Sequence, residues 1–230
     1  MITCTVCGQQ NDDLSVLCSS CRGYLQSKVE NIDLFETIWQ LIENPGDAFK
    51  KIVLAKHKNY LYVVSSLFGI STMFGIFWLK KLAPLFTNLL TLVGSGMLIG
   101  APFGMLFVFV LAGVIVIAIR LLGGSASIRN TAAVASYSSI PVVLSLVFVF
   151  PLEIAIFGVD FFGVNPPPML LNPAVYLALL GFDALAIVWT LFLLFRGVSV
   201  LSGFPKGKSL VLTFVAALVP GSLALGIKLL

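Results

Sequence analysis

Charged side chains are scarce in this chain, and their scarcity excludes an ordinary soluble domain. Only 24 of 230 residues are charged, or 10%, whereas 59% are hydrophobic and the mean hydropathy is +1.05. Soluble domains usually carry about 25% charged residues, and uncharged apolar runs of about 20 residues are typical of membrane spans. Of the 24 charges, 13 lie in the first 59 positions and the other 11 are spread over the remaining 171. The chain therefore divides into a small polar head and a membrane body.

Histidine is almost absent, and so are the usual signs of catalysis. The single histidine, His57, lies before the first apolar run, which excludes a Ser-His dyad inside the membrane. Phosphate-binding glycine loops are missing as well. An intramembrane acid pair would need a second carboxylate near Asp183, and we expect Glu153 and Asp160 nearer the outer face. The sequence therefore predicts a protein that is not an enzyme.

The chain start also lacks a basic segment followed by an apolar one, so we expect no cleaved signal and a head in the cytoplasm. Thiols stay reduced there, which favours metal binding over disulfides. Two Cys-x2-Cys pairs, ten residues apart, are the expected ligands of one structural Zn²⁺: Cys4, Cys7, Cys18 and Cys21. Residues 1–25 are thus predicted to be a zinc ribbon whose metal supplies most of its folding free energy.

Four thiolates leave no open position on the metal, so catalytic zinc is not expected. Nucleic-acid binding is not expected either, because the head has one basic side chain, Arg22, against Asp12 and Asp13. The remaining interpretation is a structural or docking module for an unidentified cytosolic partner.

Residues 26–59 are predicted to form two amphipathic connector helices. Phe35, Ile38, Trp39 and Ile42 follow helical spacing. Asn44 and Pro45 then start a second helix. Its basic side chains could lie on an anionic membrane surface, where each lysine contributes about 1 kcal/mol; these are Lys50, Lys51, Lys56 and Lys58. The alternative is that both helices pack on each other and on the membrane bundle.

The membrane domain, residues 60–230, is predicted to be the all-α bundle of a polytopic membrane protein. Its five expected spans are 60–79, 97–119, 132–152, 174–195 and 209–228. Residues 82–119 carry no charge, and as one helix they would measure about 57 Å, too long for a single crossing. We therefore expect a break at Gly94-Ser95-Gly96 and an interfacial or re-entrant helix over 82–93.

Loop charges predict the orientation. With the N-terminus inside, the inner loops hold nine Lys and Arg residues and the outer loops three, as the positive-inside rule requires. The C-terminus is then expected outside. The small residues of the pair Gly100-x3-Gly104 allow two helices to approach closely. The sequence does not decide between a monomer and a homo-oligomer.

Asp183 is the one acid expected near the middle of the bilayer, where it should face the bundle. Counting 13 residues from each inner span end sets Asp183 level with Ser145, and near Thr72 and Ser222. This polar layer is predicted to be either a proton- or ligand-sensitive site or an internal hydrogen-bonded clasp.

Three stretches together carry a family resemblance: NPGDAFKK at residues 44–51, GGSASIRNTAAVASYSSIP at 123–141 and RGVSVLSGFPKGKSL at 196–210. The chain resembles the Yip family of Ypt/Rab-interacting membrane proteins in its prokaryotic form, over about residues 40–230. Eukaryotic members act in vesicle traffic and bind Rab-type GTPases through a cytosolic N-terminal region. In this chain the predicted zinc ribbon replaces that N-terminal region. The resemblance is therefore not taken to imply Rab binding.

Three functions follow as hypotheses. The resemblance implies a non-enzymatic integral membrane scaffold or adaptor in a prokaryotic cell membrane, which docks its cytosolic partner through the ribbon and is linked to membrane organisation or trafficking. The alternative is a small transporter or channel component that uses the polar layer around Asp183. An intramembrane enzyme is the least supported, for the reasons given above.

Overall fold

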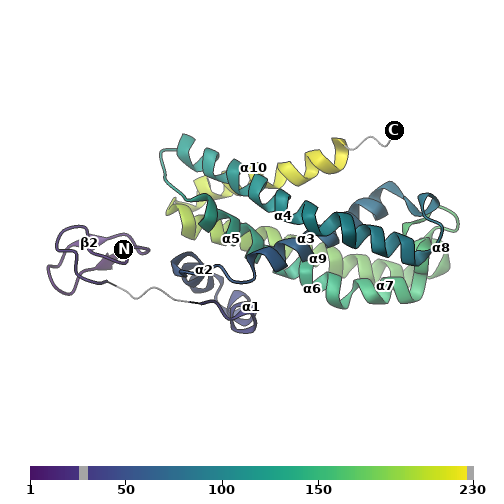
Figure 1. Cartoon of the computed structure of the whole chain (residues 1–230), viewed down its shortest axis with the longest axis horizontal. Helices are drawn as coiled ribbons and strands as arrows, with labels where there is room; N and C mark the ends of the chain where they lie inside the picture. Colours follow the sequence, from purple (N-terminus) through teal and green to yellow (C-terminus); the bar gives the residue numbers. More distant parts are fainter. Residues whose placement is uncertain (26–30, 227–230) are drawn as a thin grey trace. The chain divides into compact units, whose positions relative to one another are not determined.

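The computed structural model describes residues 1–25 and 31–226, and side chains as far as Leu218. The chain forms two compact units, residues 1–59 and 60–230, and each is described here by itself (Figure 1).

The first unit begins with a small two-stranded antiparallel sheet, β1 (Ile2–Thr3) and β2 (Gln10–Asn11), in which Ile2 pairs with Asn11. An isolated antiparallel bridge joins Leu17 to Tyr24. Two helices follow, α1 (Leu34–Glu43) and α2 (Pro45–Leu54). The predicted start of α2 is confirmed, because Pro45 opens the helix and the Asn44 side chain accepts a hydrogen bond from the backbone N–H of Asp47.

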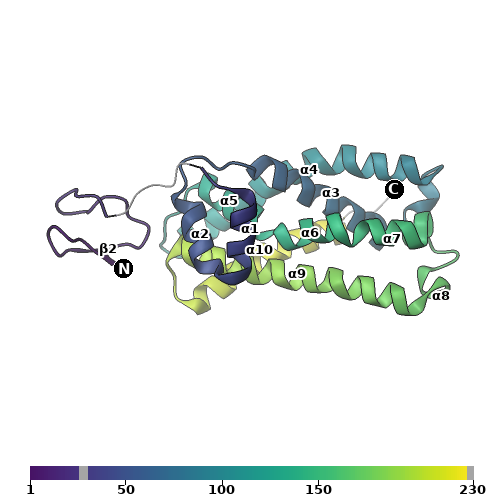
Figure 2. The ribbon, with the colours of Figure 1, turned by 90° about the horizontal axis from the view of Figure 1, so that it is seen from below.

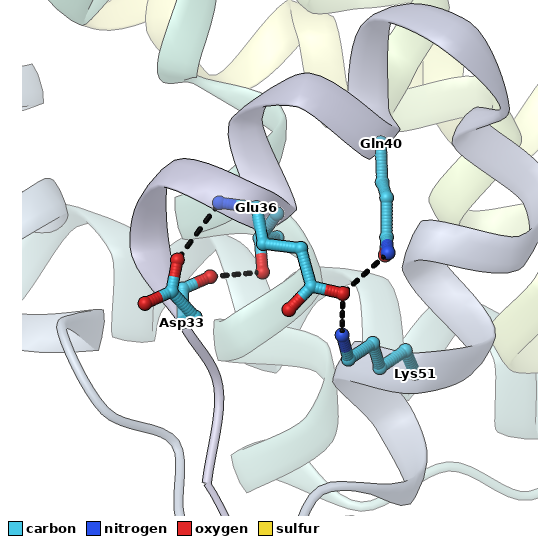
Figure 3. A network of polar contacts seen from close by, with 5 residues as sticks. Asp33, Glu36, Gln40 and Lys51 are labelled. Atoms are coloured by element: carbon cyan, nitrogen blue, oxygen red, sulfur yellow. Dashed lines mark hydrogen bonds and ion pairs between the residues drawn. The ribbon is translucent and has the colours of Figure 1, made fainter.

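The helices α1 and α2 pack on each other. The Asp33 carboxylate caps α1 by accepting from the backbone N–H of Glu36 at 2.8 Å. Figure 3 shows how Glu36 then joins the two helices: it accepts hydrogen bonds from Gln40 at 2.8 Å and from Lys51 of α2 at 2.7 Å. Leu41 of α1 and Phe49 and Ile52 of α2 are almost fully buried. This packing agrees with the alternative prediction that the two connector helices pack on each other.

The second unit is a helical bundle. Its longer helices are α3 (Leu61–Lys80), α4 (Leu89–Leu121), α9 (Pro173–Ser202) and α10 (Lys206–Gly226). Shorter helices complete it: η1 (Ala83–Leu85), α5 (Ile128–Ser138), α6 (Ile140–Phe148), α7 (Phe150–Phe157), η2 (Gly158–Phe162) and α8 (Pro168–Leu171). In Figure 2, α4 and α9 run lengthwise along opposite sides, with α6 and α7 between them. α3 packs along α4, and α9 packs against α5 and α6.

Four segments among the described residues are long and apolar enough to cross a membrane: Leu61–Lys80, Leu89–Leu121, Ile128–Phe162 and Pro173–Ser202. The helical body is therefore confirmed, and these four segments agree with its predicted place in a membrane. α10 coincides with the expected fifth span, but its crossing stays a prediction. Within the third segment the helix breaks at Ser139 and again at Val149, each two residues before a proline, because proline removes a backbone donor and crowds the preceding turn.

The expected separate helix over 82–93 is wrong. α4 begins at Leu89 and continues without a break through Gly94-Ser95-Gly96. Asn88 starts it with a capping box, in which its side chain accepts from the Thr91 backbone N–H at 2.9 Å. Gly96 serves packing instead of breaking the helix: a Cβ at this position would meet the Phe74 ring of α3 at 2.3 Å.

α3 and α4 are in backbone contact further along. A Cβ on Gly69 would meet the Gly100 carbonyl oxygen at 2.2 Å, and one on Gly104 would meet the Ser65 carbonyl oxygen at 2.1 Å. The small-residue pair Gly100-x3-Gly104 therefore marks a face buried inside one chain.

Both ends of the bundle have dense cores. At one end every residue of α5 from Thr131 to Ser138 is buried, and Ser136 Oγ donates to the Leu61 carbonyl oxygen at 3.1 Å. At the other end an aromatic cluster brings together α3, α7, η2 and α9, with Phe74 stacked on Phe150 at 4.2 Å between ring centroids. The indole N–H of Trp78 donates to the Tyr176 hydroxyl at 3.1 Å in the same region.

Candidate functional site

The four cysteines of the head lie on two turns of the same design. In the first turn the Gly8 N–H donates to the Cys4 carbonyl at 2.9 Å, and in the second the Arg22 N–H donates to the Cys18 carbonyl at 3.1 Å. Gly8 and Arg22 hold equivalent left-handed conformations, with φ of 71° and 57°. Arginine adopts this conformation less readily than glycine. The short sheet and the Leu17–Tyr24 bridge set the turns face to face.

The geometry of the sulfur atoms fits one tetrahedral metal ion. The Cys4–Cys21 Sγ distance is 3.6 Å and the Cys7–Cys18 distance is 3.5 Å, and all four sulfurs lie within 4.8 Å of one another. Four thiolates around zinc, each at about 2.3 Å, are separated by about 3.8 Å along the edges of the tetrahedron. The donor set and its spacing are therefore those of a closed structural site, with no position left for a substrate.

Backbone amides stabilise the thiolates. A hydrogen bond from the Cys21 backbone N–H lowers the pKa of the Cys18 thiol to about 6, and one from the Cys7 N–H lowers the pKa of Cys4. The Asn11 side chain adds a further donor to Cys18 Sγ at 3.5 Å. The backbone of Gly23 lowers the pKa of Cys21, but hydrogen bonds with Cys7 and Cys4 and burial raise it to about 12. Metals bind the thiolate and not the thiol, so Cys4 and Cys18 are prepared for a metal ion, whereas Cys21 would need the positive charge of the ion to lose its proton.

At least two of the four lysines predicted for a membrane surface have partners inside the first unit. Lys51 pairs with Glu36 of α1 at 2.7 Å. Lys58 Nζ donates to the carbonyl oxygens of Ile52 and Val53 at the end of α2, as cations at helix C-termini often do. Lys50 lies on α2, and Lys56 lies just beyond the end of that helix. Meanwhile the apolar side chains of Phe35, Trp39 and Ile42 on α1 remain exposed.

In the membrane body the structure brings together two of the four residues of the predicted polar layer. Ser145 Oγ of α6 donates a hydrogen bond to Asp183 Oδ1 of α9. Thr72 instead donates to the Phe68 carbonyl of its own helix at 2.8 Å. The side chain of Ser222 lies outside the described residues.

Glu153 was missed as a member of this site. The expectation that it lies away from Asp183, toward the outer face, is wrong, and its side chain on α7 is only 3% exposed. Its carboxyl group lies beside that of Asp183 on α9. Its Oε1 is buried and has no hydrogen-bond partner among the residues that the structure describes. The argument that Asp183 has no carboxylate neighbour is therefore wrong as well.

The sequence did contain one signal for Glu153. An uncompensated acid within an apolar segment has to face protein, and the break at Val149, before Pro151, separates the helix of Ser145 from that of Glu153. Counting along one straight helix could not follow that break.

Comparison with known proteins gives one finding. The family model described as the Yip1 domain matches residues 39–227. No curated protein matches the chain, and no solved structure matches it. The match covers α2 and the whole described membrane body, and it leaves out the four-cysteine head.

Proposed function

This chain belongs to the Yip1 domain family, and from that membership we propose that it is a non-enzymatic integral membrane scaffold of the prokaryotic type, which docks a cytosolic partner through its head and serves membrane organisation or trafficking. The observation that carries the proposal is the match of a membrane family over most of the chain, preceded by a head in which four cysteines cluster.

The surface of the head supports docking. Val6 and Tyr24 are 74% and 81% exposed, and Leu17, which pairs with Tyr24, is also exposed. Val6 lies beside Gly23, because a Cβ added there would meet Val6 Cγ2 at 3.5 Å. We name Val6, Leu17 and Tyr24 the head patch. Such exposed apolar side chains on so small a domain are typical of a binding surface for protein.

The metal of the head is proposed to be a single structural Zn²⁺, held by Cys4, Cys7, Cys18 and Cys21. The closed set of four thiolates and the sulfur spacing support it. The ion would fix the two turns that carry Val6 and Tyr24, so docking would depend on the metal through the shape of the head.

Docking is tested by replacing Tyr24 with a photoreactive phenylalanine analogue and crosslinking in native membranes. We expect a specific protein adduct whose yield falls about tenfold when Val6→Ser is added, since losing a buried valine contact costs about 1–2 kcal/mol. Adducts are compared by quantitative mass spectrometry.

Thr5→Ala, at the exposed position beside Val6, is the matched control and should leave the yield unchanged. Cys4→Ser with Cys7→Ser should abolish the adduct. An identical set of adducts from that double variant would refute docking through the folded head.

The topology proposed is five spans with the N-terminus in the cytoplasm and the C-terminus outside. The loop charges support it, and α10 supplies a fifth helix of 21 residues. The lysine-rich segment from residue 50 to residue 58, together with the exposed Phe35, Trp39 and Ile42 of α1, supports a connector that lies on the anionic inner leaflet.

A transporter or channel component is the second candidate function. The observation that favours it is the hydrogen bond between Ser145 and Asp183 inside the membrane body, with Glu153 beside them. Acidic groups at membrane depth commonly lie on ion or proton pathways.

The two functions are separated by Asp183→Asn in sealed vesicles that contain the purified protein. A transporter is expected to move protons or alkali cations faster than empty vesicles, and the variant should reduce that rate at least about tenfold. Ion-sensitive dyes report the flux. If wild-type vesicles are as tight as empty ones, the scaffold remains and the transporter is excluded.

A further inference from the structure

The side chains of Glu153 and Asp183 form an acidic pair within the membrane body, in which Glu153 is almost fully buried and Asp183 is partly buried. Glu153 lies on α7 and Asp183 on α9, about 15 Å along that 30-residue helix from its start at Pro173. Phe150 and Phe157, one turn before and after Glu153, belong to the apolar core, as does Leu179 on α9. The pair therefore has an environment of low polarity in which two negative charges repel strongly.

The charges around the pair do not offset this repulsion. α6, which packs against α9, contributes the neutral Ser145, and η2, which packs against α7, carries Asp160. α3 ends in Lys80, and α9 carries Arg196 about 20 Å further along from Asp183. Among the described residues, the one charged group that acts on Glu153 is Asp183.

The hydrogen bonds distinguish the two acids. Asp183 accepts a hydrogen bond from Ser145 Oγ. Glu153 has a buried Oε1 with no hydrogen-bond partner in the described part of the chain. If Glu153 were ionised, that oxygen would carry negative charge without a donor, at a cost of several kcal/mol. If Glu153 is protonated, the same oxygen is the carbonyl of a neutral acid, and the other oxygen can donate its proton to Asp183.

We propose that Glu153 and Asp183 form a proton-binding site within the membrane, in which the pair holds one proton at neutral pH, with Glu153 as the carboxylic acid and Asp183 as the carboxylate. Ser145 positions Asp183 as the acceptor. The site goes beyond the scaffold function, and it stands whether or not the bundle also conducts ions.

Infrared spectroscopy of the full-length protein in lipid nanodiscs tests the site directly. At neutral pH we expect a C=O stretching band of a protonated carboxyl group, equivalent to one group per chain, which Glu153→Gln removes. Glutamine keeps the size and the neutral hydrogen-bonding character of the protonated side chain, so this variant should fold. Asp183→Asn should keep the band and shift its frequency, because the acceptor changes from a carboxylate to an amide.

Asp160→Asn removes an acid from η2, close to α7, and is the matched control that should leave the band unchanged. The proposal is overturned if the wild type shows no protonated carboxyl band at neutral pH, or if the band survives Glu153→Gln. A band lost in Asp183→Asn and kept in Glu153→Gln would also refute the assignment of the proton to Glu153.

Thermal unfolding provides a second readout. The folded pair holds a proton that an unfolded chain releases well below neutral pH, so the folded state binds more protons and stability should fall as the pH rises. Glu153→Gln should remove this component of the pH dependence, and Asp160→Asn should retain it. An equal slope of melting temperature against pH in the wild type and Glu153→Gln would contradict the proposal.

Discussion

Gly104→Ala is expected to destabilise the membrane body by about 3 kcal/mol or more, at the upper end of what overpacking costs. The added methyl group would lie 2.1 Å from the Ser65 carbonyl oxygen and 2.6 Å from Gly69 Cα. Both atoms belong to the backbone of α3, so no side-chain rotation can relieve the clash, and α3 and α4 would have to move apart. Thermal unfolding in detergent, followed by loss of the folded peak in size-exclusion chromatography, measures the change.

Two alanine substitutions serve as controls. Gly113→Ala on α4 and Gly75→Ala on α3 place the same methyl group where nothing lies within 4 Å. Alanine is also the better helix former, by about 0.8–1 kcal/mol in soluble helices, so neither control should lower the melting temperature. Equal stability of Gly104→Ala and Gly113→Ala would show that α3 and α4 are not in backbone contact.

Cys18→Ser is expected to reduce bound zinc from about one ion per chain to a small fraction of that and to unfold residues 1–25. Serine cannot replace a thiolate ligand, and the head has only two short strands and one bridge to hold it otherwise. Removal of the metal from the wild type with a chelator should have the same effect. Metal analysis and protease sensitivity of the head measure both outcomes.

The membrane body should keep its melting temperature in Cys18→Ser, because residues 60–230 form a separate compact unit. Ser20→Ala is the matched control, since it retains the backbone N–H that donates to Cys18 Sγ and should bind metal normally. A wild-type head that resists protease equally well with and without metal would contradict a metal-dependent fold.

Local rules predicted much of this molecule. The lengths of the apolar runs predicted the long membrane segments, and Asn44 with Pro45 predicted the start of α2. The spacing of the cysteines indicated the four residues whose sulfur atoms cluster. Counting residues from the span ends set Ser145 level with Asp183, and the two are hydrogen bonded. Each of these inferences needs only the geometry of one helix or one turn.

The errors arose where tertiary packing decides the outcome. Glycine at position 96 looks like a helix breaker in isolation, but its missing side chain accommodates the Phe74 ring of another helix. The position of Glu153 depends on two breaks in the helix that precedes it, and its neighbour lies 30 residues away on α9. Neither fact is visible in a single segment of sequence.

The unbroken length of α4 has a consequence for the surrounding lipid. Its 33 residues measure about 50 Å, whereas the hydrocarbon core is about 30 Å thick and the bilayer with its headgroups about 40–45 Å. Such hydrophobic mismatch is relieved by an oblique crossing or by stretching the acyl chains around the protein, and both responses depend on bilayer thickness. The chain should therefore accumulate in thicker patches of membrane, so that its own dimensions sort it laterally.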